Sequence, residues 1–152
     1  MITETLKLVK IHENAHLIEQ CIEILNEEWP RESKQRMKTM KRSSDNFPIC
    51  LALIDDQQQN QEKVIGFVKL TSEKPFNPVI FVESLIVSKE YRRKGIGRFI
   101  MEQVEKFAKE LNFEKIHLTT TDQQEFYLKL GYLLPKCNNN NGNKILMYKH
   151  IL

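Results

Sequence analysis

The sequence lacks the features that mark membrane-spanning, secreted and disulfide-rich proteins. No apolar run approaches the roughly 20 residues that a membrane-spanning helix requires, and the N-terminal residues mix charges with short apolar steps, unlike a signal peptide. The three cysteines are widely spaced and form no C-x-x-C pair, which predicts thiols rather than disulfides. These absences favour a cytoplasmic protein, in a reducing compartment, that does not act at a membrane.

The chain as a whole also has no large excess of positive over negative charge. The net charge is +3 in 152 residues, which is too small for an obligate nucleic-acid binder. The positive charge is concentrated in residues 31–42, RESKQRMKTMKR, where six cations and one acidic residue give a local charge of +5. Such a segment is usually a solvated helix face, but it can also attract an acidic partner.

Apolar periodicity predicts an α/β protein with one domain over residues 1–152, since no linker or repeat divides the chain. A polar turn at 55–63 and an Asn-rich loop at 136–143 separate predicted elements, and Gly131 ends the last helix. The predicted elements are, in order, a strand at 6–11, helices at 13–29 and within 31–42, strands at 48–55, 64–70 and 79–87, a helix at 96–111, a strand at 116–120, a helix at 123–130, and strands at 132–134 and 144–151.

The most informative segment is Tyr91–Glu102, YRRKGIGRFIME. Two glycines one residue apart follow three consecutive cations, after an apolar strand and before an amphipathic helix. Amide donors at a glycine turn, a helix N-terminus and added positive charge together make a site for a phosphorylated ligand. A plain strand-to-helix turn is the alternative interpretation of these residues.

Two motifs resemble the GNAT superfamily of N-acetyltransferases. Arg92–Gly97 fits R-x-x-G-x-G, which is similar to the acetyl-CoA pyrophosphate loop, and FYLKLGY at 126–132 resembles the C-terminal F-Y-x-x-x-G-[FY] signature. The order of elements resembles that of a GNAT domain over the full chain. The resemblance implies a mixed, mostly antiparallel central sheet with a splayed cofactor-binding strand pair, about four flanking helices, and acetyl-CoA as co-substrate. No residues stand at metal-ligand spacing, and we expect no metal.

The resemblance also implies the residues that hold the cofactor. The backbone of a bulged strand at Ser84–Val87 is expected to pair with pantetheine, and the amides of the loop to bind the pyrophosphate. In the family a tyrosine at the place of Tyr127 protonates or stabilises the leaving thiolate, and Thr120 stands where an Asn often bonds pantetheine. The expected cofactor-binding residues are Leu85, Ile86, Val87, Arg92, Arg93, Lys94, Gly95, Ile96, Gly97, Arg98, Thr120 and Tyr127.

Glu83 and Tyr127 are the candidate catalytic residues. Glu83 is the only carboxylate in the apolar strand 79–87, so it either faces solvent or is retained for a reason. The family often places a general base on this strand, and burial would raise the pKa of such a base; a structural hydrogen-bond role is the alternative. His117, on the next strand, either lines the same cleft or is a partly buried histidine satisfied by hydrogen bonds.

Three further blocks resemble one subfamily, the N-terminal acetyltransferases dedicated to processed actin. They are L-N-x-x-W-P-R at 25–31, S-S-D-x-F-P-[LI]-C-L at 43–51 and H-L-T-T-x-D-Q-x-x-F-Y at 117–127. Animal members carry a Pro-rich insertion where this chain has residues 136–143. Mature actins begin with several Asp or Glu residues, and a basic lip would attract such a tail. The expected substrate-binding residues are Trp29, Arg31, Lys34, Arg36, His117, Thr119 and Thr121.

These observations favour one function over several alternatives. The expected activity is acetylation of the α-amine of an acidic protein N-terminus, with actin as the partner and an actin-binding protein as a further candidate partner. The alternatives are acetylation of another N-terminus or of a small amine, and a non-catalytic module that binds acyl-CoA. Trp29 could also be a core aromatic that closes the first helix. Nucleic-acid binding through residues 31–42 is disfavoured because the segment has no interleaved aromatic residues.

Overall fold

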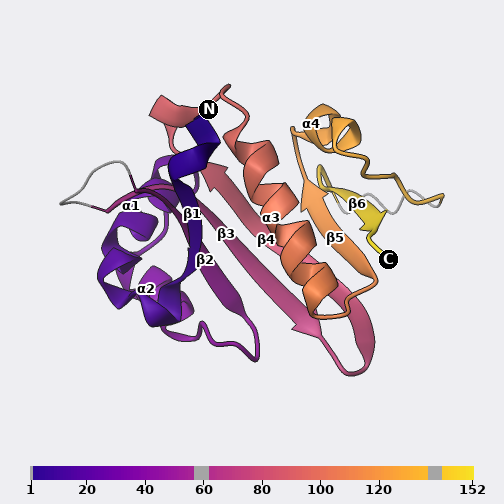
Figure 1. Cartoon of the computed structure of the whole chain (residues 1–152), viewed down its shortest axis with the longest axis horizontal. Helices are drawn as coiled ribbons and strands as arrows, with labels where there is room; N and C mark the ends of the chain where they lie inside the picture. The colour runs from indigo at the N-terminus through magenta and orange to yellow at the C-terminus, as the bar shows by residue number, and fades with distance from the viewer. Residues whose placement is uncertain (1, 57–61, 137–141) are drawn as a thin grey trace. The chain divides into compact units, whose positions relative to one another are not determined.

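A computed structural model of the chain describes residues 2–56, 62–136 and 142–152. Six strands form one sheet in the order β1-β2-β3-β4-β5-β6 (Figure 1). The sheet is mixed, because β4 and β5 pair in parallel whereas β1 with β2, β2 with β3, and β5 with β6 are antiparallel. The strands are β1 Leu6–Lys10, β2 Ile49–Asp55, β3 Lys63–Glu73, β4 Asn77–Val87, β5 Lys115–Thr120 and β6 Ile145–His150, and the helices are α1 Ile18–Glu28, α2 Ser33–Lys41, α3 Ile96–Glu110 and α4 Gln124–Lys129.

The observed elements confirm the predicted α/β order, with differences that have local causes. The first helix begins at Ile18 rather than at residue 13, after two 3₁₀ turns. Asn14 interrupts the helix because its side chain donates to the Lys10 carbonyl, an alternative to helical bonding that Asn favours. β4 begins at Asn77 rather than at residue 79, so Pro78 lies within the strand. Within the described ranges no helix is both long and apolar enough to cross a bilayer.

The predicted strand at 132–134 is also wrong. Tyr132 uses its amide to donate to the Tyr127 carbonyl and so closes the end of α4. Leu133 then forms one isolated antiparallel bridge with Tyr148, and Pro135 has no amide with which to extend the pairing. Residues 57–61 of the predicted polar turn and 137–141 of the Asn-rich loop, including Cys137, lie outside the described residues.

The chain divides into two compact units, residues 1–70 with 84–103 and residues 71–83 with 104–152, each of which is described by itself. In the first unit α1 and α2 pack against each other (Figure 1). Apolar residues recur every three or four positions along α1, so one face of this helix is buried. Cys21 and Cys50 lie in this core, and burial raises the pKa of the Cys21 thiol to about 12. The core residues are Ile11, Leu17, Ile18, Cys21, Ile22, Ile24, Leu25, Met40, Cys50, Ala52, Ile54, Val64, Phe67 and Ile86.

Gly66 allows a close approach of β3 to its neighbours in the first unit. A Cβ atom at this position would lie 3.0 Å from Ile100 Cδ1 of α3 and 3.2 Å from the Ile86 carbonyl oxygen of β4. Next to this position, the amide of Ser88, which follows β4, donates a hydrogen bond of 2.8 Å to the carbonyl of Ile65 in β3. The missing side chain therefore sets the distance between β3, the end of β4 and the first turns of α3.

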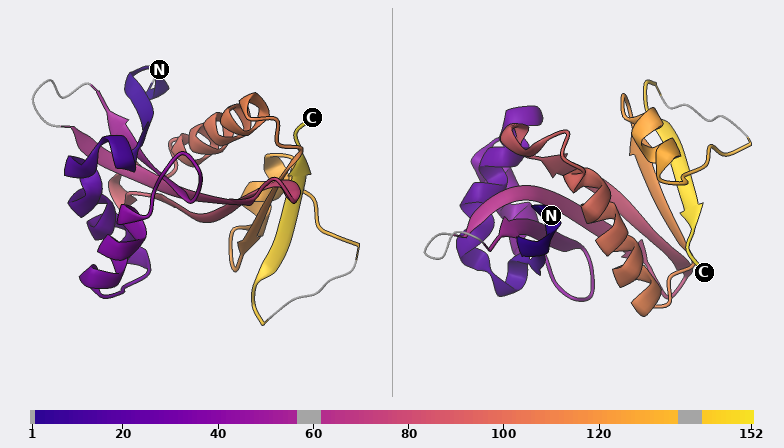
Figure 2. Two further views of the ribbon diagram at one scale, coloured as in Figure 1. Left: turned by 90° about the horizontal axis from the view of Figure 1, so that it is seen from below. Right: turned by 45° about the horizontal axis from the view of Figure 1, so that its top comes forward.

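The second unit is built on β5, which pairs with strands on both sides. The β4–β5 register runs from Val79 opposite Lys115 to Val82 opposite Leu118. β5 and β6 lie side by side along their whole length (Figure 2). The Tyr132 hydroxyl and the Lys149 ammonium of β6 both donate to Glu105 of α3, at 3.1 and 2.8 Å. This polar network joins α3 to the C-terminal strand.

Candidate active site

The backbone between β4 and α3 has the conformation that an anion-binding loop requires. Arg93 and Gly95 both have positive φ angles, 63° and 77°, and the extended Arg92 precedes them. Alternation of left-handed and other conformations turns successive amides toward one side, which makes an anion-binding concavity. α3 begins at Ile96, and the first amides of any helix have no partner within the helix. The loop therefore presents backbone donors at the positive end of a 15-residue helix.

The side chains of this loop are exposed, but some already contact the protein. Arg92 donates from Nε to the Val87 carbonyl at 2.9 Å, and its Nη2 lies 3.4 Å from Glu28 Oε2 at the end of α1. Arg98 pairs with Glu102 on the next turn of α3 at 2.9 Å. Arg92 thus ties the loop to the end of β4 and to α1, and its bond to Val87 occupies one of the backbone oxygens expected to pair with pantetheine.

The end of β4, where the cofactor is expected to pair, extends beyond the pairing of this strand with β5. The parallel register with β5 ends at Val82, and β4 continues through Glu83 to Val87. Ile86 is buried in the core, whereas Leu85 and Val87 are half-buried. Because the register with β5 ends at Val82, Leu85 and Val87 belong to a strand segment beyond the parallel pairing.

Tyr127 lies in α4 with 7% of its surface exposed. Its ring packs edge-to-face against Phe126 and Tyr132, at centroid distances of 4.9 and 5.7 Å. Burial raises the pKa of Tyr127 to about 12, so its phenol stays protonated at physiological pH. Thr120 is also buried, and its Oγ1 accepts the Gln123 amide at 3.0 Å. Thr120 therefore shapes the turn that leads into α4.

The two buried tyrosines predict a loss of stability at alkaline pH. Burial raises the pKa of Tyr127 to about 12 and also raises that of Tyr132, next to the Glu105 carboxylate. The unfolded chain releases these protons near pH 10, so the folded state holds more protons above that pH and loses stability. Each tyrosine should contribute a slope of about 1.4 kcal/mol per pH unit above pH 10. Urea unfolding at pH 8 to 11 measures this slope, and an unchanged slope in Tyr132→Phe would contradict the assignment.

Glu83 and His117 lie on the same face of the second unit. Glu83 is exposed and accepts a hydrogen bond from Thr71 Oγ1 at 3.2 Å, so of the two alternatives for this carboxylate it faces solvent. The His117 ring is half-buried and packs edge-to-face on Phe81, with centroids 5.5 Å apart. Burial lowers the pKa of His117, as do the nearby Lys115 and His150, so a neutral ring is favoured at neutral pH. Thr119 and Thr121 are both exposed.

In the first unit, four of the expected substrate-binding residues lie at the connection between α1 and α2 and in α2. Trp29, at the end of α1, has 43% of its surface exposed, which excludes the alternative of a buried core aromatic. Arg31 and Lys34 are exposed, whereas Arg36 is half-buried and donates to the Asn26 side chain at 3.1 Å. Met37 and Met40 turn toward the core. The exposed cations of this surface, here named the cationic segment, are Arg31, Lys34, Lys38, Lys41 and Arg42.

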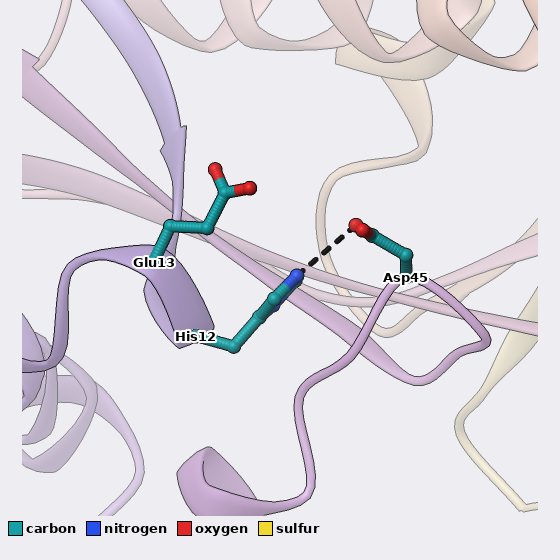
Figure 3. Close-up of side chains that lie close together, drawn as sticks. All are labelled: His12, Glu13 and Asp45. Atoms are coloured by element: carbon teal, nitrogen blue, oxygen red, sulfur yellow. Dashed lines mark hydrogen bonds and ion pairs between the residues drawn. The ribbon is translucent and has the colours of Figure 1, made fainter.

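The 3₁₀ turn after β1 and the segment after α2 are joined by a polar cluster (Figure 3). Ligand-type atoms of His12, Glu13 and Asp45 lie within 4.8 Å of one another. However, the Lys10 ammonium is 2.7 Å and His12 Nε2 3.0 Å from the same Asp45 oxygen, and both lower the pKa of this carboxyl. Ser43 Oγ lies 2.9 Å from His12 Nδ1 and accepts the Cys50 amide. The cluster therefore fits a structural link better than a metal site.

Several of these contacts could not be found from the sequence. Glu28, which binds Arg92, stands at an unspecified position of the 25–31 block, whereas Asn26, which binds Arg36, is a fixed residue of that block. Ser43 and Asp45 carried a signal, because they belong to the S-S-D-x-F-P block at residues 43–51. Their contacts with His12 give this block a structural role: it fixes the path from α2 to β2.

The loop geometry and the sheet define a class of α/β proteins that bind a phosphorylated ligand at the start of a helix. Residues 16–132 match the profile of the Acetyltransferase (GNAT) family. The chain therefore belongs to the GNAT family of acetyltransferases.

One relative and two solved structures show what the chain is similar to. Mouse N-alpha-acetyltransferase 80 is 37% identical over 120 residues, which are 78% of this chain but only 38% of the mouse protein. An aminoglycoside 6'-N-acetyltransferase complexed with coenzyme A has a TM-score of 0.75 at 20% identity, covering 96% of this chain and 97% of that chain. Arabidopsis thaliana NAA60 in complex with a bisubstrate analogue has a TM-score of 0.74 at 16% identity, covering 96% and 98%. The solved structures confirm the fold.

Proposed function

We propose that this protein is an acetyl-CoA-dependent N-terminal acetyltransferase for acidic protein N-termini, with processed actin as its substrate. Membership of the GNAT family and the similarity to an N-alpha-acetyltransferase support the reaction. The observation that carries the acidic specificity is the cationic segment, whose five exposed cations adjoin the exposed Trp29.

Acetyl-CoA is proposed to bind through the backbone of the loop. The amides of residues 93–98 would bind the pyrophosphate, where the positive φ angles of Arg93 and Gly95 orient the donors. Arg93 and Lys94 would add charge-assisted hydrogen bonds. The backbone at Leu85 and Val87 would pair with pantetheine, with an amide polarising the thioester carbonyl.

The proposed reaction is direct attack of the acceptor amine on the thioester carbonyl. The tetrahedral intermediate collapses with CoA as the leaving group, and Tyr127 supplies a proton to the departing sulfur. Glu83, exposed on β4, is the proposed base that accepts the ammonium proton through water. An α-amine with a pKa near 8 is neutral in roughly a fifth of molecules at physiological pH, against about one in a thousand for lysine. A protein N-terminus therefore needs less help from a base.

CoA release with three peptides tests this function. The peptides are one with a free Asp-Asp-Asp-Glu N-terminus, one with a free neutral N-terminus, and one with a blocked N-terminus and an internal lysine. We expect strong preference for the acidic free N-terminus, because the cationic segment attracts its carboxylates. Turnover of either other peptide instead would retain acetyl transfer but exclude acidic specificity. No CoA release with any of the three peptides would favour a small amine as the acceptor, or a non-catalytic module that binds acyl-CoA.

A charge reversal, Arg31→Glu, sharpens the same test. It should raise the KM for the acidic peptide about fivefold, the scale of one exposed ion pair, and leave acetyl-CoA binding unchanged. Lys109→Glu is the matched control, since it reverses an exposed cation on α3 outside the cationic segment. Added salt should raise the wild-type KM, because exposed charges are screened beyond roughly 8 Å at physiological ionic strength. A flat response to salt would remove the electrostatic explanation.

A further inference from the structure

The corner between α1 and α2 is held by one half-buried guanidinium, that of Arg36. Its Nε donates to Asn26 Oδ1 at 3.1 Å, and its Nη2 donates to the Trp29 carbonyl oxygen. The same Asn26 oxygen accepts the backbone amide of Arg31 at 3.1 Å. Three hydrogen bonds therefore join the last turn of α1, the connection and α2.

The connection has few other means of holding its shape. Pro30 has no amide to donate, and Trp29 has left the helical conformation at φ −130°. The last carbonyls of α1 carry partial negative charge, so a cation placed among them is favourable. A planar guanidinium can bridge two acceptors in a fixed geometry, whereas a lysine ammonium cannot reproduce this fork.

The burial of Arg36 sets it apart from the other cations of the 31–42 stretch. Burial lowers the pKa of its guanidinium, and the positive charge of Arg31 lowers it further. Its Nε and Nη2 donate to Asn26 and Trp29 within the chain, while Arg31 and Lys34 are exposed. The contacts of Arg36 thus point inward to the corner.

We propose that Arg36 is a positioning residue of the acceptor site: together with Asn26 it fixes the backbone that carries Trp29 and Arg31. The exposed cations attract the carboxylates of the acidic peptide. Arg36 does not touch the substrate but holds the backbone of the corner in place. The inference rests on the proposed function in placing the acceptor at Trp29 and Arg31. The corner itself can be tested without any substrate.

The test compares variants that separate charge from geometry. Arg36→Lys keeps the charge but loses the fork, and Arg36→Met loses both. Asn26→Ala removes the shared acceptor while raising the helix propensity at that position, so a loss cannot come from a poorer α1. Lys34→Met is the matched control, because it removes an exposed cation from the same helix. Trp29 is the only tryptophan, so its fluorescence reports on this corner alone.

We expect Arg36→Lys, Arg36→Met and Asn26→Ala each to raise the KM for the acidic peptide about tenfold, the scale of losing a hydrogen bond to a charged group. Acetyl-CoA affinity should stay at the wild-type value, which also shows that the variants fold. The Arg36→Met, Asn26→Ala double variant should be no worse than either single change. Lys34→Met should have a smaller effect that disappears at high salt.

Two outcomes would overturn the inference. If Arg36→Lys has the wild-type KM while Arg36→Met does not, Arg36 acts by its charge. If the emission maximum and acrylamide quenching of Trp29 are unchanged in Arg36→Met and Asn26→Ala, the corner does not depend on these bonds. Should the wild type fail to acetylate the acidic peptide, the proposed function fails, and the fluorescence still decides whether Arg36 and Asn26 hold the corner.

Discussion

Gly95→Val is expected to weaken acetyl-CoA binding by about tenfold or more. Gly95 has φ +77°, a conformation that costs a side chain with a Cβ roughly 1–2 kcal/mol and is a clear outlier for a β-branched residue. Among the described residues other than its chain neighbours, none has a heavy atom within 4 Å of the position that a Cβ would take, so the effect comes from the backbone conformation and not from a clash. The loop would leave the conformation that turns its amides toward one side. Isothermal titration with acetyl-CoA measures the loss.

The chain offers a matched control for this change. Gly142 also has a positive φ, 68°, and equally open surroundings, but it lies far along the chain between α4 and β6. Gly142→Val should therefore cost comparable stability and leave acetyl-CoA binding unchanged. Gly95→Asn should be milder than Gly95→Val, since Asn adopts the left-handed conformation more readily. Equal binding losses in the two valine variants would show that strain in general, and not the loop, weakens binding.

Tyr127→Phe is expected to lower kcat by about a hundredfold, the usual scale of a lost general acid. The KM for acetyl-CoA should change little. The ring keeps its packing against Phe126 and Tyr132, because only the hydroxyl is removed. With the pKa of Tyr127 at about 12, the phenol is the protonated form throughout the accessible pH range. Ionisation of Tyr127 should therefore not cause any fall of the wild-type kcat below about pH 11.

Tyr132→Phe controls for the loss of a buried phenol. The Tyr132 hydroxyl donates to Glu105, 3.1 Å away, so this variant loses a structural hydrogen bond. It should lower the free energy of unfolding by about 1 kcal/mol and leave kcat near the wild-type value. A wild-type kcat in Tyr127→Phe would exclude Tyr127 as the proton donor, and the leaving thiolate would then depart without that help.

The parts of the fold and site that could be predicted depend on short-range chemistry. The start of α3 at Ile96 follows from apolar residues at helical spacing, and the loop before it follows from glycines that permit positive φ. The order of the strands along the chain was readable for the same reason. The strand at 132–134 was predicted wrongly, because an amide used to close α4 cannot be inferred from the apolar pattern.

Contacts between distant residues explain what could not be predicted. An apolar strand does not reveal which of its faces is covered, and so the sequence left open whether Glu83 faces solvent. Arg92 and Glu28 are 64 positions apart, and their pairing depends on how α1 ends near the loop. The charge of Arg36 suggested a role toward substrate, whereas its contacts with Asn26 and Trp29 depend on the corner that α1 and α2 form.

Gly66 has a consequence for the protein inside a cell. Its missing side chain is what brings Ile86 of β4 and Ile100 of α3 close to β3. Any larger residue would strain the core next to the loop without touching a ligand. Because a loss of 1–2 kcal/mol is enough to change cellular abundance several-fold, such a variant would be cleared by chaperones and proteases. The phenotype would then reflect a shortage of the protein, although each surviving molecule kept its reactive groups.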